Sequence, residues 1–197
     1  RSLDAKGVDT DAGRVSARAV VVATAAPAAA DLLPGLDVPR MNAVTTLYHL
    51  ADVAPMTEPV LVLDGTGGGP VANTIVLTNA APGYADRDRV LVSTSVVGPP
   101  ADCPPEPTIR AHLARLYGVD TSGWHHVATY PVADALPDQS PPLGNLRRPV
   151  RAGGRRYVCG DHRDTGSIQG ALVSGRRAAD ALLADLGIRS HHPEAAA

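Results

Sequence analysis

The sequence has little cysteine, a single lysine and no long hydrophobic run. Its two cysteines, Cys103 and Cys159, form no CxxC pair and no disulfide framework, so we expect two reduced thiols in a cytoplasmic protein. No stretch of ~20 apolar residues occurs, and we therefore expect no transmembrane helix. A net charge of -2 gives no electrostatic case for binding nucleic acid or an anionic membrane.

Other short signals are missing as well. There is no secretory signal sequence, and the chain begins with Arg1 rather than methionine, which suggests a fragment or a processed product. His125 and His126 are adjacent on an expected strand, so their side chains point to opposite faces. With no other ligand spacing of the kind that zinc requires, we expect no metal site.

Three phosphate-binding or nucleophile motifs are absent. No GxGxxG segment opens a βαβ unit; the glycines of 65–69 are followed by Pro70 and a strand, and we interpret them as a hairpin loop. The run Gly166-Ser167-Ile168-Gln169-Gly170 lacks the spacing of a GxSxG nucleophile elbow, and there is no P-loop. These absences argue against a hydrolase.

Both ends of the chain have an α/β pattern. Residues 8–15 predict a hairpin, and Ala19 to Ala23 is an apolar run typical of a strand buried on both faces. Pro27 then opens a short helix over 28–33. Near the other end, a strand over 155–159 leads through Gly160-Asp161 to a helix over 168–186.

The middle of the chain predicts an antiparallel sheet with one helix. The helix spans 106–117, where Ile109, Leu113 and Leu116 share a face. Short loops rather than helices separate the expected strands, which span 43–50, 60–63, 71–78, 90–97 and 125–132. A proline-rich loop over 136–149 leads back, so an α/β unit built from both ends encloses an inserted α+β unit.

The segment from Tyr157 to Ala179 carries the strongest chemical signal. A strand that ends at Gly160-Asp161 places a flexible backbone and a carboxylate where open α/β sheets bind ligands. Thr165 and Ser167 supply capping hydroxyls to a helix whose free N–H groups and positive dipole end face the same region.

Two stripes follow the expected helix. Its small residues recur every three or four positions and allow a close approach to a sheet or cofactor; they are Ser167, Gly170, Ala171, Ser174 and Ala178. A second stripe is predicted to face the core and contains Leu172, Ala179, Leu182 and Leu186.

These residues resemble a known motif. The runs Arg156-Tyr157-Val158-Cys159-Gly160-Asp161, Ser167-Ile168-Gln169-Gly170-Ala171 and Ser174-Gly175-Arg176-Arg177-Ala178-Ala179 are similar to the C-terminal FAD motif of the amine oxidase superfamily. That group includes amine oxidases, protoporphyrinogen oxidases and carotenoid (phytoene) desaturases. The stretches 19–24 and 32–35 resemble a later strand of the same FAD domain, and 135–137 resembles the stretch before the final motif.

The resemblance implies FAD as cofactor and an α/β FAD-binding domain that lacks its N-terminal glycine-rich βαβ unit. Asp161 would hold the ribityl or phosphate region, and the backbone amides of Ile168 and Gln169 would face the pyrimidine edge. Gly160, Ser167 and Thr24 would complete the cofactor site. The implied domains are 1–40 and 150–189 for FAD and 41–149 for the substrate, with 190–197 a disordered tail.

Departures from the family pattern narrow the implied chemistry. Amine oxidases usually place an aromatic residue where this chain has Ser167, and they often carry a lysine near the flavin N5, whereas the only lysine here is Lys6. The resulting hypothesis is hydride transfer from an organic, apolar substrate to flavin N5, with no protein nucleophile, no assigned catalytic residue and His162 as a candidate acid or base.

Two alternatives stay open. The chain could be a truncated or split, non-catalytic polypeptide that needs a partner with the GxGxxG segment, that is, an N-terminal FAD-binding half. It could also be a flavin amine oxidase despite the two departures.

Overall fold

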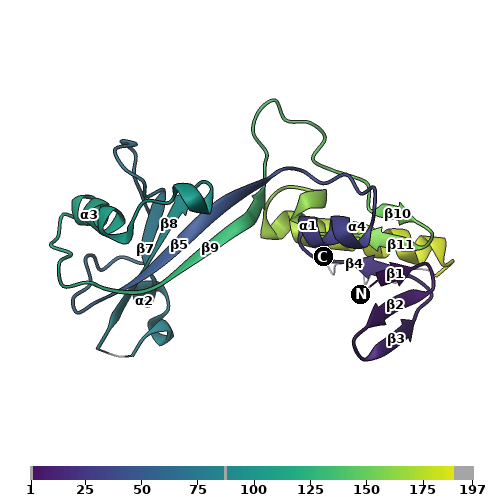
Figure 1. Ribbon diagram of the computed structural model, residues 1–197, viewed down its shortest axis with the longest axis horizontal. Coiled ribbons are helices and arrows are strands. Elements are labelled where there is room, and N and C mark those ends of the chain that lie inside the picture. Colours follow the sequence, from purple (N-terminus) through teal and green to yellow (C-terminus); the bar gives the residue numbers. More distant parts are fainter. Residues whose placement is uncertain (1, 87, 189–197) are drawn as a thin grey trace, which may run out of the picture. The chain divides into compact units, whose positions relative to one another are not determined.

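The computed structural model describes residues 2–86 and 88–188, so the expected tail over 190–197 lies outside the described residues. The chain forms two compact units, which Figure 1 colours by position in the sequence. The first unit combines Arg1–Met41 with Leu136–Ala197, and the second is Asn42–Ala135.

The second boundary falls at Ala135, whereas the expected substrate domain ran to 149. Backbone hydrogen bonds explain the difference. Asp138 N–H donates to the Arg40 carbonyl at 2.7 Å, and Arg148 N–H donates to the Arg163 carbonyl at 3.1 Å. The proline-rich segment therefore belongs with the first unit.

The first unit contains two small sheets. One is an antiparallel meander of β1 (Ser2–Asp4), β2 (Gly7–Thr10) and β3 (Gly13–Ser16), of which the sequence predicted the β2–β3 hairpin but not β1. The other has the order β10–β11–β4, with β10 at Arg151–Gly153, β11 at Arg156–Val158 and β4 at Val20–Val22. β4 and β11 run parallel, and Val22 lies opposite Val158.

Three helical segments accompany this parallel pair. α1 (Ala26–Leu32) follows β4, with Pro27 in its first turn, and η3 (Asp161–Arg163) follows β11. The long helix α4 (Ile168–Asp185) packs on both η3 and β11. Val22, Ala29, Leu33 and Val158 form one small core, and Tyr157, Cys159, Ala178 and Ala181 belong to another.

The prediction that β4 is buried on both faces is wrong. Val20 and Val22 are buried, but Val21 between them is 42% exposed. β4 is an outer strand of its sheet within the described residues, and the face that carries Val21 is partly open there. Within the described residues, the apolar run is therefore fully buried on one face only.

The second unit is built on one five-stranded sheet in the order β6–β7–β8–β5–β9. The β6–β7, β7–β8 and β8–β5 pairs are antiparallel. The strands are β5 (Met41–Ala51), β6 (Val62–Leu63), β7 (Asn73–Val76), β8 (Val90–Val97) and β9 (His125–Pro137). The helical segments are α2 (Leu77–Ala80), η1 (Pro82–Tyr84), η2 (Pro100–Asp102) and α3 (Glu106–Tyr117).

Strand alternation gives this sheet two different faces. Leu47 on β5 and Val92 on β8 are buried, and they share a core with Ile109 and Leu113 of α3. Residues of the opposite parity, such as Tyr48 and Leu91, point to the other face and are only partly buried. One face therefore carries the core, and the other stays open within the unit.

Three strand predictions in the middle need correction. The strand expected over 60–63 is limited to Val62–Leu63, the part that pairs with β7. The strand expected over 71–78 spans Asn73–Val76, because α2 begins at Leu77 and turns the chain toward η1. The strand expected to end at Val132 continues to Pro137. β9 is an edge strand, where a proline such as Pro131 costs no ladder hydrogen bond on its free side.

No helix within residues 2–86 and 88–188 is long and apolar enough to cross a membrane.

Candidate functional site

The candidate site lies where β4 and β11 end side by side. Cys159 N–H donates to the Val22 carbonyl at 3.0 Å, which carries the parallel pairing to the last residue before Gly160. Gly160 has φ +146°, and a Cβ built there would lie 3.6 Å from the Thr24 carbonyl oxygen. The two strand ends thus bring Thr24 beside Gly160-Asp161, at the carboxyl edge where α/β sheets bind ligands.

Ser174 on α4 fixes the position of Gly160. Its Oγ accepts the Gly160 N–H at 2.9 Å and donates to the Gly160 carbonyl at 2.7 Å. Ser174 is fully buried, so water cannot replace these bonds. The strand end and the helix are therefore held in one fixed arrangement.

The first turn of α4 begins at a regular N-cap. Ser167 Oγ accepts the Gly170 N–H at 3.0 Å, and Thr165 Oγ1 lies 3.1 Å from Ser167 Oγ. A helix provides no carbonyl for its first N–H groups, here those of Ile168 and Gln169. Both residues are exposed, with Ile168 at 77%, so this positive end of the helix is open.

The two carboxylates of this segment differ in their partners. Asp164 is held by Arg177 Nη1 at 3.1 Å and by the Thr165 N–H at 3.1 Å. The Asp161 side chain is 30% exposed, and His162 Nδ1 lies 3.8 Å from its Oδ1. No hydrogen bond joins the Asp161 carboxylate to any other described residue, so it has free capacity to accept hydrogen bonds.

Comparison with family models decides the affiliation. Residues 2–183 match the model of the flavin containing amine oxidoreductases. The chain belongs to this family. Membership implies FAD as the cofactor and oxidoreductase as the class of protein. A comparison with curated proteins finds no match.

Several solved structures share the fold of this chain. A candidate protoporphyrinogen oxidase from an Exiguobacterium species has TM-score 0.64 and 15% identity, over 89% of this chain and 43% of that one. Reduced UDP-galactopyranose mutase has TM-score 0.65 and 11% identity, over 94% and 45%. An oxidoreductase from Methanosarcina mazei has TM-score 0.59 and 13% identity, over 89% and 46%. The chain thus spans a little under half the length of these proteins.

Several features of the site fit the flavin that the family implies. The Asp161 carboxylate can accept hydrogen bonds from hydroxyl groups, and the amides of Ile168 and Gln169 can donate to carbonyl oxygens. Gly160 leaves the backbone open beside Thr24. The residues that could hold FAD are therefore Gly160, Asp161, Ser167, Ile168, Gln169 and Thr24.

His162 does not fit the role of an exposed acid or base. It is 1% exposed, and neither of its ring nitrogens has a hydrogen-bond partner. Burial is the main cause that lowers the pKa of His162, and the nearby Arg163 guanidinium lowers it further. The ring is therefore neutral at pH 7 and lies beneath Gly160, where a Cβ would come within 2.5 Å of it.

The buried face of α4 is formed by its small residues, and the stripe expected to face the core is partly exposed. The small residues Gly170, Ser174 and Ala178 form the buried face, whereas Leu172, placed in the core stripe by the sequence, is 69% exposed. A Cβ on Gly170 would meet the Thr165 carbonyl oxygen at 1.9 Å, so the small residues serve contact with the chain's own loop and sheet.

Sequence reasoning missed the structural role of Ser174, although its place in the small stripe was the available signal. Cys159 is buried, and burial raises the pKa of its thiol. Across residues 2–86 and 88–188, no group of three or more His, Cys, Asp or Glu side chains could hold a metal ion.

Proposed function

We propose that this chain is the C-terminal part of an FAD-dependent oxidoreductase that removes hydride from an organic, mainly apolar substrate. The observation that carries the proposal is that the Asp161 carboxylate and the open N-terminus of α4 both follow the end of β11. No described residue donates a hydrogen bond to the Asp161 carboxylate, and the helix provides no acceptor for its first N–H groups. Both correspond to groups of a flavin nucleotide.

Each site residue has a role in this proposal. Asp161 accepts hydrogen bonds from ribityl hydroxyls, which a charged acceptor strengthens. The amides of Ile168 and Gln169 would donate to the carbonyl edge of the ring, and the positive end of α4 would favour negative charge at that edge. Ser167 caps the helix, and Gly160 with Thr24 lets the cofactor lie against the backbone.

The bound cofactor supplies the hydride acceptor of the reaction. The substrate would lose a hydride from carbon to the bound flavin and a proton to solvent, and it would gain a double bond. The chain's own part is to bind and orient. We assign no protein nucleophile and no catalytic acid or base, because His162, the closest titratable ring, is buried and neutral.

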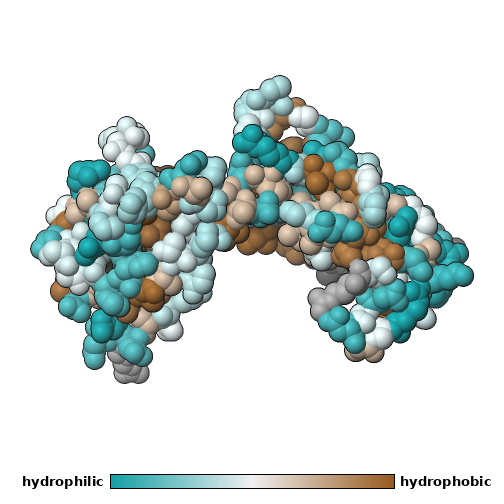
Figure 2. Space-filling view, in the orientation of Figure 1, coloured by the Kyte–Doolittle hydropathy of each residue, from teal (hydrophilic) through white to brown (hydrophobic). Residues whose placement is uncertain are grey.

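We further propose that an N-terminal FAD-binding half, on the same polypeptide or on a partner, completes the site. The sequence has no GxGxxG segment to anchor the pyrophosphate. Apolar side chains that a finished domain would cover are exposed around this site, namely Val21, Ile168, Leu172 and Val173. Figure 2 shows hydrophobic residues at the surface around α1 and α4 of the same unit.

Oxidation of an amine is the second candidate activity. The family's description favours it. Ser167 in place of an aromatic residue, and Lys6 in the turn between β1 and β2, weaken it. We therefore place a non-amine substrate first.

The test uses the protein isolated from its natural source with an antibody against this chain. We expect the preparation to release about one FAD per chain on heating, and a GxGxxG segment to be present on the captured polypeptide or on a bound partner. A preparation without flavin would overturn the proposal. Flavin without any such segment would overturn only the part that concerns the N-terminal half.

A further inference from the structure

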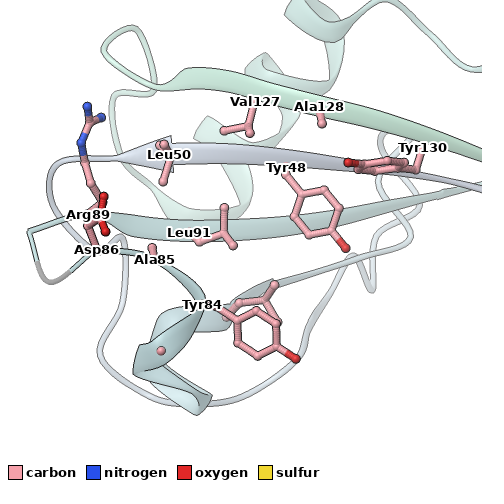
Figure 3. Close-up of a pocket in the computed structure, with 12 residues that line it drawn as sticks. Tyr48, Leu50, Tyr84, Ala85, Asp86, Arg89, Leu91, Val127, Ala128 and Tyr130 are labelled. Carbon is pink, nitrogen blue, oxygen red and sulfur yellow. The ribbon is translucent and has the colours of Figure 1, made fainter.

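The open face of the sheet in the second unit carries a cavity of about 760 Å³. Every residue that lines it belongs to Asn42–Ala135, so the cavity is complete within one unit. Its floor is the face of β5, β8 and β9 opposite α3, and one wall is the α2–η1 segment (Figure 3). The cavity is open to solvent, and its volume lies in the range of pockets that bind small organic molecules.

The lining is aromatic and aliphatic. Leu50 lies directly across from Leu91 in the β5–β8 register and forms an apolar floor. The rings of Tyr48 and Tyr130 meet edge to face with centroids 5.8 Å apart. Figure 3 shows the Tyr84 ring on the η1 side of the cavity, with Tyr48 and Leu91 on the strands opposite.

The packing of this unit does not explain why these tyrosine rings are exposed. Tyr84 is 66% exposed, and Tyr130 and Val127 on β9 are exposed as well. Tyrosines usually bury their rings and keep only the hydroxyl in water. Three of the four tyrosines in this unit instead line one cavity, which leaves ring faces and edges free for a ligand.

The two charged side chains among the described lining residues, Asp86 and Arg89, are opposite in sign. Asp86 and Arg89 lie next to one another at the end far from Tyr130 in Figure 3, and the Arg89 N–H donates to the Asp86 carbonyl at 2.9 Å. Arg89 would attract an anion and Asp86 would repel it, whereas Asp86 would attract a cation and Arg89 would repel it. The pair therefore favours neither kind of charged ligand. The remaining polar groups are tyrosine hydroxyls, which both donate and accept hydrogen bonds.

We propose that this cavity, lined by Tyr48, Tyr84 and Tyr130, binds an uncharged, planar, conjugated molecule that carries a hydroxyl or carbonyl group. Aromatic walls favour a flat π-system over a saturated ring of equal size, and the tyrosine hydroxyls orient its oxygen. That the molecule is the substrate to be oxidised rests on the proposed function. The binding itself needs no flavin.

The experiment measures binding of beta-naphthol to the 197-residue chain by equilibrium dialysis. Decahydro-beta-naphthol serves as the saturated analogue, and beta-naphthoate as the charged one. We expect beta-naphthol to bind roughly three- to tenfold more tightly than the saturated alcohol, since an aromatic pair adds that much to burial alone. The naphthoate binds more weakly, because its carboxylate loses water without a net opposite charge.

Two variants locate the binding. Tyr84→Leu and Tyr48→Leu keep an apolar side chain but remove the ring, and each should weaken beta-naphthol binding roughly three- to tenfold. Leu63→Ala, an exposed change on β6 outside the cavity, should leave it unchanged. Tyr84 is exposed enough that its variant should fold, which circular dichroism checks.

Three results would overturn the inference: no binding of beta-naphthol, equal binding of the saturated alcohol, or unchanged binding in both tyrosine variants. The flavin content of the protein from its natural source is measured separately. If that protein contains no flavin but the chain binds beta-naphthol, the proposed redox function is overturned and the proposed binding site is not.

Discussion

Ser174 and Gly160 form a two-way hydrogen-bonded contact between α4 and the end of β11. The serine Oγ accepts the glycine N–H at 2.9 Å and lies 2.7 Å from the glycine carbonyl oxygen, with no exposure to water. The contact sets where Asp161 and the first turn of α4 lie relative to each other. It therefore controls the geometry of the candidate flavin site.

Ser174→Ala should lower the free energy of unfolding by about 1–3 kcal/mol. The change leaves the Gly160 N–H without a partner, whereas the Gly160 carbonyl keeps the Arg163 N–H at 3.1 Å, and one such loss costs on the order of 1–3 kcal/mol. Urea unfolding of the chain measures it. Ser16→Ala on the exposed strand β3 is the control and should stay within about 0.5 kcal/mol of the wild type. A Ser174→Ala chain as stable as the control would contradict the account.

Two glycines of α4 should respond oppositely to the same substitution. A Cβ on Gly170 would lie 1.9 Å from the Thr165 carbonyl oxygen, whereas a Cβ on Gly175 meets nothing within 4 Å. Gly170→Ala should destabilise the chain by about 1–3 kcal/mol through overpacking. Gly175→Ala should stabilise it by up to about 1 kcal/mol, because alanine is the better helix former.

Thermal unfolding of the two variants side by side is the measurement. Since helix, substitution and method are shared, only the surroundings of the added methyl group differ. Equal effects of the same sign would show that α4 does not approach the Thr165 loop as closely as described.

How far the sequence predicts this fold depends on whether the signal is local. The helix over 106–117 and the strand over 90–97 were predicted with the bounds that α3 and β8 have. α3 has a periodic apolar face and ends at Gly118 in the left-handed conformation, and both features are legible in the sequence.

The misses depend on contacts between distant segments. β10 is three residues long and forms because it pairs with β11. No local sequence pattern predicts this pairing. Leu172 looked like a core residue by spacing, but the Ser174–Gly160 contact turns the small residues of α4 inward and leaves Leu172 exposed. Asp161 could be picked out by its place after a strand; that its carboxylate has no internal partner could not.

The stability of the first unit should fall as the pH drops from about 7 toward 5 because of His162. Burial lowers the folded-state pKa of His162 below its ordinary value of 6.5. As the pH falls through 6.5, the unfolded chain binds a proton there before the folded chain does, so the free energy of unfolding decreases. The decrease levels off below the folded-state pKa.

His162→Gln removes this titration and should flatten part of the decline, measured as urea unfolding free energies at about pH 7, 6 and 5. Carboxylates with lowered pKa values, such as Asp64 and Asp185, contribute mainly below their ordinary value of 3.8. Burial also lowers the pKa of His49, but His49 is present in both chains, so the difference between them reports His162. An identical decline in the variant would show that His162 is not buried as a neutral ring.

In the second unit, the position of the His112 ring requires glycine at residue 69. The Val71 N–H donates to His112 Nδ1 at 3.1 Å, which leaves the proton on Nε2, 3.2 Å from Asp64 Oδ2. A Cβ on Gly69 would lie 2.4 Å from that Nδ1. Gly69→Ala should therefore displace the imidazole and cost about 1–3 kcal/mol of unfolding free energy.

Gly65→Ala is the matched control in the same loop, because a Cβ there meets nothing within 4 Å. It should change stability by less than about 0.5 kcal/mol. Equal losses in the two variants would mean that the loop as a whole, rather than the imidazole contact, requires glycine.

The most direct test of the central claim, that Asp161 and the start of α4 hold FAD, is the FAD affinity of the complete protein with Asp161→Ala. Asp31→Ala, an exposed carboxylate on α1 of the same unit, is the control. Losing hydrogen bonds to a charged acceptor costs about 1.5–3 kcal/mol, so we predict FAD binding roughly ten- to a hundredfold weaker in Asp161→Ala and unchanged in Asp31→Ala. Equal affinity in the two variants, with both chains folded, would contradict the account.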